Sequence, residues 1–244
     1  MKEKDRLYSH ATSDPGEFVF DQRVVRVFPD MINRSVPGYG TIVPMIGMLA
    51  RRYALPGTRV YDLGCSLGAV SLAIRSAVGQ RDLEIIAVDN SPDMIHGFRD
   101  ILEGMDETGL VPVELRQQDI CNMPLENASV VVLNFTLQFV PPGRRDSLLR
   151  RIADALHPGG VLLLSEKVRF DDPEEQSLQT EWHHDFKRAQ GYSELEIARK
   201  RDALENVMKP ESMARHRARL EGAGFDRVFT WFQGFNFMSM LAFR

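Results

Sequence analysis

The feature that most restricts the fold of this chain is a series of short apolar runs with helical segments between them. The runs 128–134 (ASVVVLN) and 160–168 (GVLLLSEKV) lack the polar alternation of a half-exposed strand. Such runs are typical of parallel strands that helices cover on both faces. Three further runs, at 58–64, 83–89 and 112–119, also predict short strands. This order of elements predicts an α/β fold with a doubly wound, mostly parallel sheet.

Both ends of the chain add elements to this sheet. Near the C-terminus, two β-rich runs at 225–235 and 236–244 predict a terminal antiparallel hairpin, which would make the sheet seven-stranded. Near the N-terminus, the stretch 18–53 has apolar residues at helical spacing, with interruptions at Pro29 and near Gly38. We expect two or three N-terminal helices there, because proline interrupts a helix.

A charged stretch follows the fifth predicted strand. The residues 172–208 predict two helices joined near Gly191, which we interpret as a helical insertion. The helix before the fifth strand is expected within 141–160, where proline begins it and a Pro-Gly-Gly run ends it. The polar segment 1–17 is predicted to be flexible, so that 18–244 forms a single domain.

The composition excludes several classes of protein. The chain has 244 residues, of which 43% are hydrophobic, and a formal net charge of −4. That charge argues against direct nucleic-acid binding, which usually requires a basic excess. Two cysteines are too few for a disulfide framework or a zinc ribbon. No run resembles a signal peptide or a membrane span, so we expect a cytoplasmic protein without membrane contact.

A glycine-containing loop follows the first predicted strand. Gly64 lies where that strand ends, which is the edge at which doubly wound sheets bind ligands. A glycine there lets a ligand approach the backbone closely. Asp89 ends the second strand and can accept hydrogen bonds from both hydroxyls of a ribose. Asp119 ends the third strand and can accept from an adenine amino group, while the backbone N–H of Ile120 can donate to the ring.

Two ligand classes fit this layout, namely dinucleotides and S-adenosyl-L-methionine. The loop 64–68 (GCSLG) lacks the G-x-G-x-x-G pattern that places a pyrophosphate on a helix N-terminus. Asp62 would repel a pyrophosphate, whereas its charge suits the ammonium group of a methionine tail. The pattern therefore favours S-adenosyl-L-methionine. A purely structural alternative stays open, in which the glycines serve packing and Asp62 caps the next helix.

Longer runs carry a more specific signal. VFPDMINRSVPGY (27–39), YDLGCSLGA (61–69), NASVVVLNFTLQF (127–139) and the stretch 183–208 resemble the carboxy-S-adenosyl-L-methionine synthase family. The likeness extends from about residue 18 to the end of the chain. It implies a Rossmann-like fold of the class I methyltransferase type.

The resemblance also implies a reaction. Enzymes of this family convert S-adenosyl-L-methionine and prephenate to carboxy-S-adenosyl-L-methionine and phenylpyruvate. In the family scheme, prephenate loses carbon dioxide and hydroxide, the hydroxide removes a proton from the S-methyl group, and the resulting ylide captures the carbon dioxide. A separate enzyme then uses the carboxylated product to form 5-oxyacetyl uridine at the wobble position of tRNA.

The resemblance assigns the nucleoside contacts to positions of this chain that match the family motifs. These positions are Tyr39, Gly64, Cys65, Ser66, Asp89, Asn90, Asp119, Ile120, Asn134 and Arg201. Arg201 matches an arginine that binds the transferred carboxylate from the other subunit of a homodimer. A guanidinium there suits the carboxylated ligand better than the plain sulfonium, because it attracts a carboxylate and repels a like charge.

Some functional assignments stay open at this stage. The sequence identifies neither a catalytic residue nor the residues that bind prephenate. His183-His184 gives no metal site, because adjacent helical residues point about 100° apart. Two other functions are weighed, namely a conventional methyltransferase that acts on a small acid or RNA, and a non-catalytic subunit that only holds the nucleoside. The residues after the fourth strand, beginning Asn134-Phe135-Thr136, lack the Pro-Pro motif of amine methyltransferases.

Overall fold

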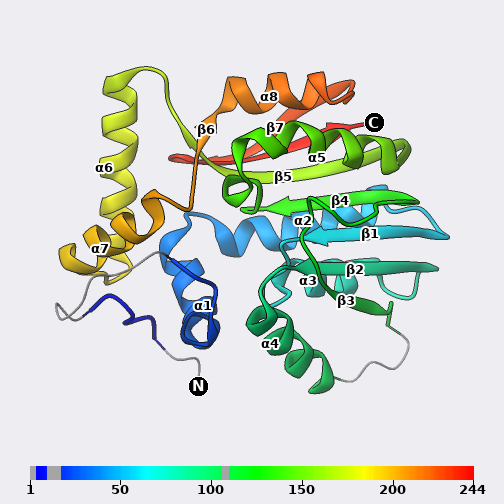
Figure 1. Cartoon of the computed structure of the whole chain (residues 1–244), viewed down its shortest axis with the longest axis horizontal. Helices are drawn as coiled ribbons and strands as arrows, with labels where there is room; N and C mark the ends of the chain where they lie inside the picture. The colour runs from blue at the N-terminus through cyan, green and yellow to red at the C-terminus, as the bar shows by residue number, and fades with distance from the viewer. Residues whose placement is uncertain (1–3, 10–17, 106–109) are drawn as a thin grey trace.

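A computed structural model describes residues 4–9, 18–105 and 110–244. One twisted sheet runs through the molecule in the order β3-β2-β1-β4-β5-β8-β7 (Figure 1). Its strands are β1 (Thr58–Leu63), β2 (Leu83–Asp89), β3 (Val113–Gln117), β4 (Ala128–Asn134), β5 (Leu156–Arg169), β7 (Arg227–Gly234) and β8 (Phe237–Phe243). The pairs among β1 to β5 are parallel, and β8 pairs antiparallel with both β5 and β7. The predicted seven-stranded sheet with its terminal hairpin is confirmed.

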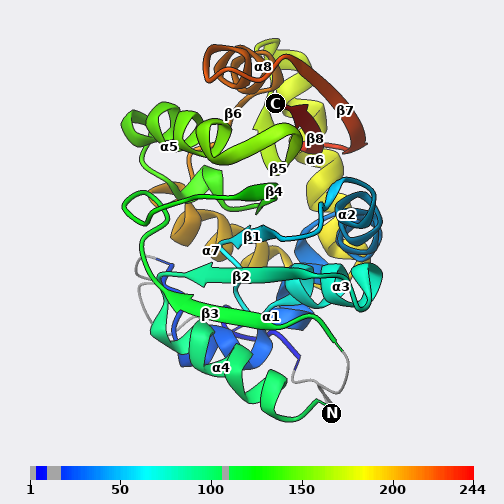
Figure 2. The same ribbon diagram turned by 90° about the vertical axis from the view of Figure 1, so that its right-hand side faces the viewer.

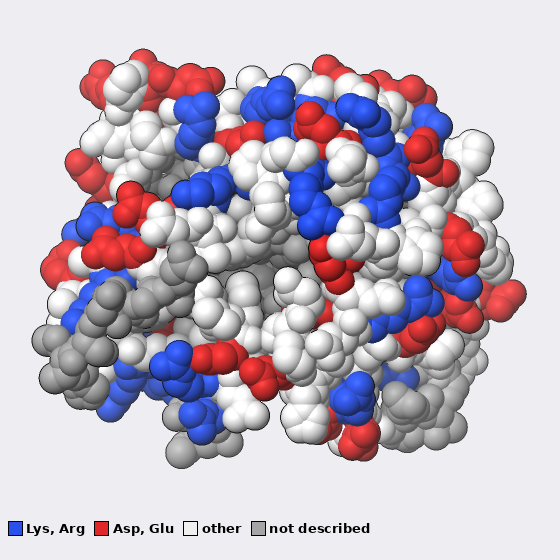
Figure 3. All heavy atoms as spheres, in the orientation of Figure 1, with Lys and Arg blue, Asp and Glu red and all other residues white. Residues whose placement is uncertain are grey.

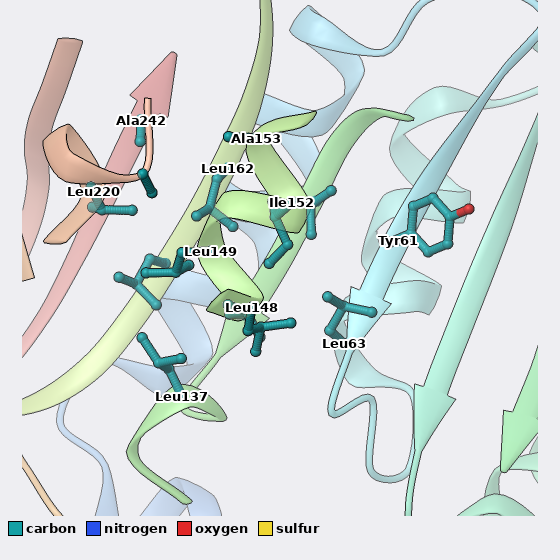
Figure 4. Close-up of a cluster of buried hydrophobic side chains, with 14 of the residues drawn as sticks. Tyr61, Leu63, Leu137, Leu148, Leu149, Ile152, Ala153, Leu162, Leu220 and Ala242 are labelled. Carbon is teal, nitrogen blue, oxygen red and sulfur yellow. The ribbon is translucent and has the colours of Figure 1, made fainter. Parts of the chain in front are cut away.

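Helices cover both faces of this sheet, as the apolar strands predict (Figure 2). The helices are α1 (Gln22–Ser35), α2 (Tyr39–Tyr53), α3 (Ala69–Val78), α4 (Pro92–Glu103), α5 (Pro142–Ala155), α6 (Pro173–Ala189), α7 (Glu194–Glu205) and α8 (Met213–Gly222), with a short 3₁₀ helix at Leu137–Phe139. One core cluster joins α2 and α3 to the sheet, and another joins α5 and α8 to the opposite face. In the second cluster, Leu148, Leu149 and Ile152 of α5 pack against strands β1, β4 and β5 (Figure 4).

The N-terminal helices differ from the expectation at one proline. The chain turns between α1 and α2 at Gly38, which has a φ of +78°, as predicted. Pro29, however, lies inside α1 and does not interrupt it. A proline removes one backbone hydrogen bond. Here the helix is held on both sides of it by Val24 and Met31, which are buried in a common cluster.

The boundaries around the fifth strand also differ from the expectation. Helix α5 ends at Ala155 and β5 begins at Leu156, so that His157 and the Pro-Gly-Gly run belong to β5, although Gly159 has a φ of +81°. The parallel pairing of β5 with β4 starts at Leu156 and resumes at Val161 after a register shift. The turn residues therefore form an irregular strand start. A two-residue strand, β6 (Glu211–Ser212), pairs with the end of β5 and was not predicted.

The predicted insertion forms α6 and α7, which lie beyond the carboxyl ends of the parallel strands together with α1 (Figure 1). Within the described residues, no helix is long and apolar enough to cross a membrane. Part of the segment predicted to be flexible has a defined place, because Asp5 is buried and its backbone N–H donates to Asp30. Residues 1–3 and 10–17 of that segment lie outside the described residues. The division into domains stays a prediction.

Candidate functional site

A cavity of about 660 Å³ lies where the parallel strands end. One wall comes from the loops after β1, β2, β3 and β4, and the opposite wall comes from α1, α6 and α7. The molecular surface is hollowed near the middle of this face (Figure 3). Nine of the ten predicted contact residues line the cavity, namely Tyr39, Gly64, Cys65, Ser66, Asp89, Asn90, Asp119, Ile120 and Asn134.

The loop after β1 has a conformation that favours glycine. Gly64 has a φ of +84°, and a Cβ atom there would lie 2.3 Å from the Thr136 hydroxyl oxygen. Gly68 has a φ of +78°, and a Cβ atom there would lie 2.1 Å from the Phe98 ring. Both glycines therefore have a packing role, which agrees with the purely structural interpretation of the loop. They also bring the backbone of 64–66 to the cavity wall, which a ligand could approach.

Asp89 is fixed by the backbone of two loops. Its Oδ2 accepts a hydrogen bond from the Ser66 N–H at 2.9 Å, and its Oδ1 accepts one from the Ser91 N–H at 2.9 Å. Burial raises the pKa of Asp89, and these backbone donors act against that shift. Each carboxylate oxygen has a second lone pair. Asp89 can therefore accept two further hydrogen bonds from a diol such as a ribose.

Asp62 is the most buried carboxylate of this wall. Its Oδ2 accepts from both the N–H and the hydroxyl of Ser71, in the first turn of α3, at 3.0 and 2.6 Å. Asp62 thus accepts from a free N–H group in the first turn of α3, which is the helix-capping role that the purely structural interpretation gives it. Burial raises the pKa of Asp62 to about 6, the Ser71 hydrogen bonds oppose the shift, and the charge of Asp89 adds to it. A cationic group in the cavity would stabilise both carboxylates.

Cys65 carries a buried thiol at the cavity wall. The side chain is 5% exposed. Burial raises the pKa of the thiol well above its ordinary value, and the neighbouring carboxylates Asp62 and Asp89 raise it further. A thiol in such a place is not a ready nucleophile, because the thiolate is the reactive form.

The loop after β3 shows one contact that the sequence interpretation missed. Asp119 accepts hydrogen bonds from the Cys121 N–H at 2.8 Å and from Arg144 at 3.0 Å. Partial burial acts to raise the pKa of Asp119, but these donors outweigh it and the pKa falls below its ordinary value. Arg144 lies in the first turn of α5. Its place opposite the β3 loop depends on tertiary structure.

Asn134 offers an unsatisfied acceptor. Its Oδ1 is buried and has no hydrogen-bond partner among the described residues. A buried amide oxygen without a donor costs free energy, and it fits a ligand that carries an N–H or O–H group. The next residue, Phe135, has a φ of +60° and contacts the Tyr39 ring at a centroid distance of 6.4 Å. Together with Asp89 and Asp62, this acceptor fits a cationic nucleoside.

Arg201 is the predicted contact that the single chain does not bring into the cavity. Its side chain is 64% exposed on α7 and pairs with Asp202 at 3.2 Å. The adjacent residue, Lys200, does line the cavity. The role assigned to Arg201 therefore stays a prediction that involves a second copy of the chain.

Four further residues of the cavity wall were not assigned to the site by sequence analysis. They are Lys167 at the end of β5, His183 and Lys187 on α6, and Lys200 on α7. His183 and Lys187 are four residues apart, so their spacing placed them on one helix face. His183 forms a 2.8 Å hydrogen bond with the Ser35 carbonyl, and no group of three metal-ligating side chains occurs in the part of the chain that the structure describes.

Comparisons with known proteins agree with this geometry. A model of the methyltransferase domain matches residues 60–160. The carboxy-S-adenosyl-L-methionine synthases of Geobacter sp. strain M21 and Trichlorobacter lovleyi are 56% and 57% identical, each over 100% of this chain and 99% of the relative. The chain belongs to the carboxy-S-adenosyl-L-methionine synthase family. The synthase of Stutzerimonas stutzeri is 55% identical over 98% of this chain and 97% of its own length.

Solved structures place this synthase family member within a wider fold class. Human N-acetylserotonin methyltransferase, solved with S-adenosyl-L-methionine, aligns with a TM-score of 0.63 and 16% identity over 91% of this chain and 55% of that chain. The cyclopropane synthase MmaA2 from Mycobacterium tuberculosis aligns with a TM-score of 0.56 and 16% identity over 75% of this chain and 61% of that chain. At these identities the likeness concerns the fold alone. The predicted methyltransferase-type fold is confirmed.

Proposed function

We propose that this synthase converts S-adenosyl-L-methionine and prephenate to carboxy-S-adenosyl-L-methionine and phenylpyruvate. The observation that carries the proposal is full-length identity above 50% to carboxy-S-adenosyl-L-methionine synthases. The cavity supports it, because one wall offers carboxylates and an amide oxygen while the other offers ammonium groups. A cationic nucleoside and an anionic acid can therefore lie side by side in one space of about 660 Å³.

The nucleoside is proposed to bind at the strand ends. Asp89 accepts from the ribose hydroxyls, and the backbone of the loop 64–66 lies against the methionine portion. Asp119 accepts from the adenine amino group while the Ile120 N–H donates to the ring. Asn134 accepts from the methionine ammonium group, which satisfies its buried oxygen. Tyr39 and Asn90 complete the contacts that the family resemblance implies.

The proposed reaction balances without a nucleophile from the chain. Prephenate gives up carbon dioxide and hydroxide and becomes phenylpyruvate. The carbon dioxide is bonded to the former S-methyl carbon, and the proton lost from that carbon combines with the hydroxide to form water. The protein then has to bind the two substrates, orient them toward each other and exclude water from the cavity. The raised pKa of the Cys65 thiol agrees with a mechanism that uses no thiolate.

The active form is proposed to be a homodimer in which Arg201 of one copy binds the new carboxylate in the other. Its 64% exposure in the single chain leaves it free to meet a second copy. Arg201→Ala should weaken binding of the carboxylated nucleoside by about tenfold or more, since a charge-assisted hydrogen bond contributes roughly 1.5–3 kcal/mol. Binding of the plain nucleoside should change little. Equal losses for both ligands, measured by calorimetry, would remove this role.

The product is proposed to pass to a separate tRNA-modifying enzyme that forms 5-oxyacetyl uridine, in the cytoplasm, where tRNA is modified. The central test incubates purified protein with both substrates and weighs the nucleoside by mass spectrometry. We expect a carboxylated nucleoside together with phenylpyruvate. Absence of both products would reject the proposal. Formation of S-adenosylhomocysteine with a small acid or RNA would indicate a conventional methyltransferase, and nucleoside binding without turnover would indicate a binding subunit.

A further inference from the structure

The part of the cavity lined by the end of β5, by α6 and by α7 carries an excess of positive charge. Lys167, Lys187 and Lys200 come from β5, α6 and α7, and all three line the cavity. Lys187 and Lys200 are 7% and 5% exposed. Among the residues that the structure describes, no carboxylate pairs with the ammonium groups of Lys167 or Lys187, whereas Lys200 has Asp5 at 3.6 Å. We call these three lysines the lysine wall.

Other contacts of the lysine wall hold it in place without neutralising it. Lys200 donates to the Ser35 hydroxyl at 2.8 Å, and the ammonium group of Lys167 lies 6.0 Å from the centre of the Phe237 ring. That ring also packs against His183 at a centroid distance of 4.9 Å. Burial lowers the pKa of His183 far below its ordinary value, and Lys187 and Lys167 add to this shift. The imidazole is therefore neutral and supplies no charge.

Buried ammonium groups without partners are costly to the folded protein. Functional sites are where proteins retain such costly groups, and buried ammonium groups are suited to bind an anion. We propose that the lysine wall binds the carboxylates of the second substrate, a dicarboxylic acid, and so holds that substrate opposite the nucleoside. This inference rests on the proposed function and extends it by naming the residues that recognise the acid.

The charge count favours a dianion over the carboxylate of the nucleoside's own methionine tail. When all three lysines are protonated, they face one neighbouring carboxylate, Asp5, so two positive charges are left for an anionic ligand. A single methionine carboxylate would balance only one of them. The methionine ammonium, in turn, is better placed near Asp62 and Asn134 on the other wall, because like charges repel in a closed cavity.

The protonation of the lysine wall should respond to the acid. Burial lowers the pKa of Lys187 to about 7, with Lys167 and Lys200 adding to the shift, and burial lowers the pKa of Lys167 and of Lys200 to about 8. An anion beside these groups raises their pKa again. Binding of the acid near pH 7.5 should therefore take up protons. The charged or titratable groups around the wall are Asp5, Asp30, Arg34, His183, His184, Tyr192 and Arg201.

The experiment uses steady-state kinetics and calorimetry on the full chain. Lys187→Met and Lys167→Met keep the length of the side chain and remove a buried charge, so both variants should fold at least as stably as the wild type. We expect each to raise the KM for prephenate by about tenfold or more. The affinity for S-adenosyl-L-methionine should stay within about twofold. The matched control is Lys209→Met, an exposed lysine outside the cavity, which should change neither quantity.

Binding without turnover gives a second measurement. Prephenate is titrated into the protein saturated with S-adenosylhomocysteine, which has no S-methyl group, in two buffers of different ionisation enthalpy. The wild type should take up protons and Lys187→Met should take up fewer. If the wild type turns over but the variants keep its KM and proton uptake, the lysine wall is not the acid site. If the variants lost equal affinity for prephenate and for S-adenosyl-L-methionine, the lysine wall would instead bind the carboxylate of the methionine tail. A wild type without turnover would reject the proposed function instead.

Discussion

The two walls of the cavity are built in different ways. At the strand ends, backbone N–H groups of neighbouring loops hold Asp89 on both oxygens, and α3 holds Asp62 through Ser71. Lys167 at the end of β5 and Lys187 on α6, by contrast, have no carboxylate partner among the described residues. One wall is organised before any ligand arrives, whereas the other keeps unbalanced charge.

This difference separates two tasks. The preorganised acceptors lie at the edge where doubly wound sheets bind ligands, and none of them comes from the insertion. The unpaired cations on β5 and α6 suit the anionic acid that the lysine wall is proposed to bind. Substitutions on one wall should therefore affect one substrate.

The largest effect is expected at Gly64. Gly64→Ala places a Cβ atom 2.3 Å from the Thr136 hydroxyl oxygen in a positive-φ conformation, and should cost about 2–5 kcal/mol of folding free energy. Nucleoside affinity should fall at least a hundredfold. Gly57→Ala is the matched control, because Gly57 also has a positive φ but no atom within 4 Å of the added Cβ. It should cost about 1 kcal/mol and keep the affinity. Thermal unfolding measures the stability and calorimetry the affinity. If both variants lost equal stability and affinity, the close contact between a Cβ atom at position 64 and Thr136 would not be the cause.

A smaller effect is expected for Asp89→Asn. The amide has one acceptor oxygen, so it cannot accept from both the Ser66 and the Ser91 N–H groups, and it loses the charge that strengthens hydrogen bonds to ribose. Nucleoside affinity should fall by about 10- to 100-fold, measured by calorimetry. The KM for prephenate, at saturating nucleoside, should stay close to that of the wild type. A variant that instead loses prephenate affinity would show that the walls are not separate.

Asp62→Asn should change stability in a pH-dependent way. Because burial raises the pKa of Asp62 to about 6, the folded state favours the protonated carboxyl. The stability that the protonated Asp62 carboxyl contributes is fully present below about pH 4 and is lost as the pH rises through about 6. The free energy of unfolding, measured in urea, should therefore be higher for the variant than for the wild type by about 1–3 kcal/mol at pH 7.5. At pH 4.5 the two free energies of unfolding should be nearly equal. A difference that is independent of pH would exclude Asp62 as its source.

The smallest effect is expected for Arg144→Gln. The ion pair with Asp119 is 42% exposed on both sides, and such pairs contribute at most about 1 kcal/mol. The KM for the nucleoside should rise by about two- to fivefold at low salt and by less at high salt, because salt screens exposed charges. A loss that persists at 1 M salt would mean that Arg144 contacts the nucleoside directly.

The sequence predicted the strand-end wall well, because local signals specify it. Apolar runs located the parallel strands, and the residues that follow them must meet at one edge of the sheet. Gly64, Asp89 and Asp119 could be placed there from spacing alone. Their neighbour Asn134 required the family resemblance.

The lysine wall could not be placed in the same way. The insertion at 172–208 was predicted as helices, but periodicity does not give the direction in which an insertion packs. The contact between Lys200 and Ser35 joins residues 165 positions apart. Pro29 failed as a helix boundary for a related reason, since tertiary packing of α1 outweighs the local cost of a proline.

Asp5 has a consequence for how the chain is made. It is 1% exposed, and its Oδ2 accepts a hydrogen bond from Tyr192, which lies 187 positions later. A polypeptide that leaves the ribosome from its N-terminus cannot form this link until most of it has been synthesised. The lysine wall is thus among the last parts of the molecule to be completed, and ribosome-bound fragments that end before α7 should lack it.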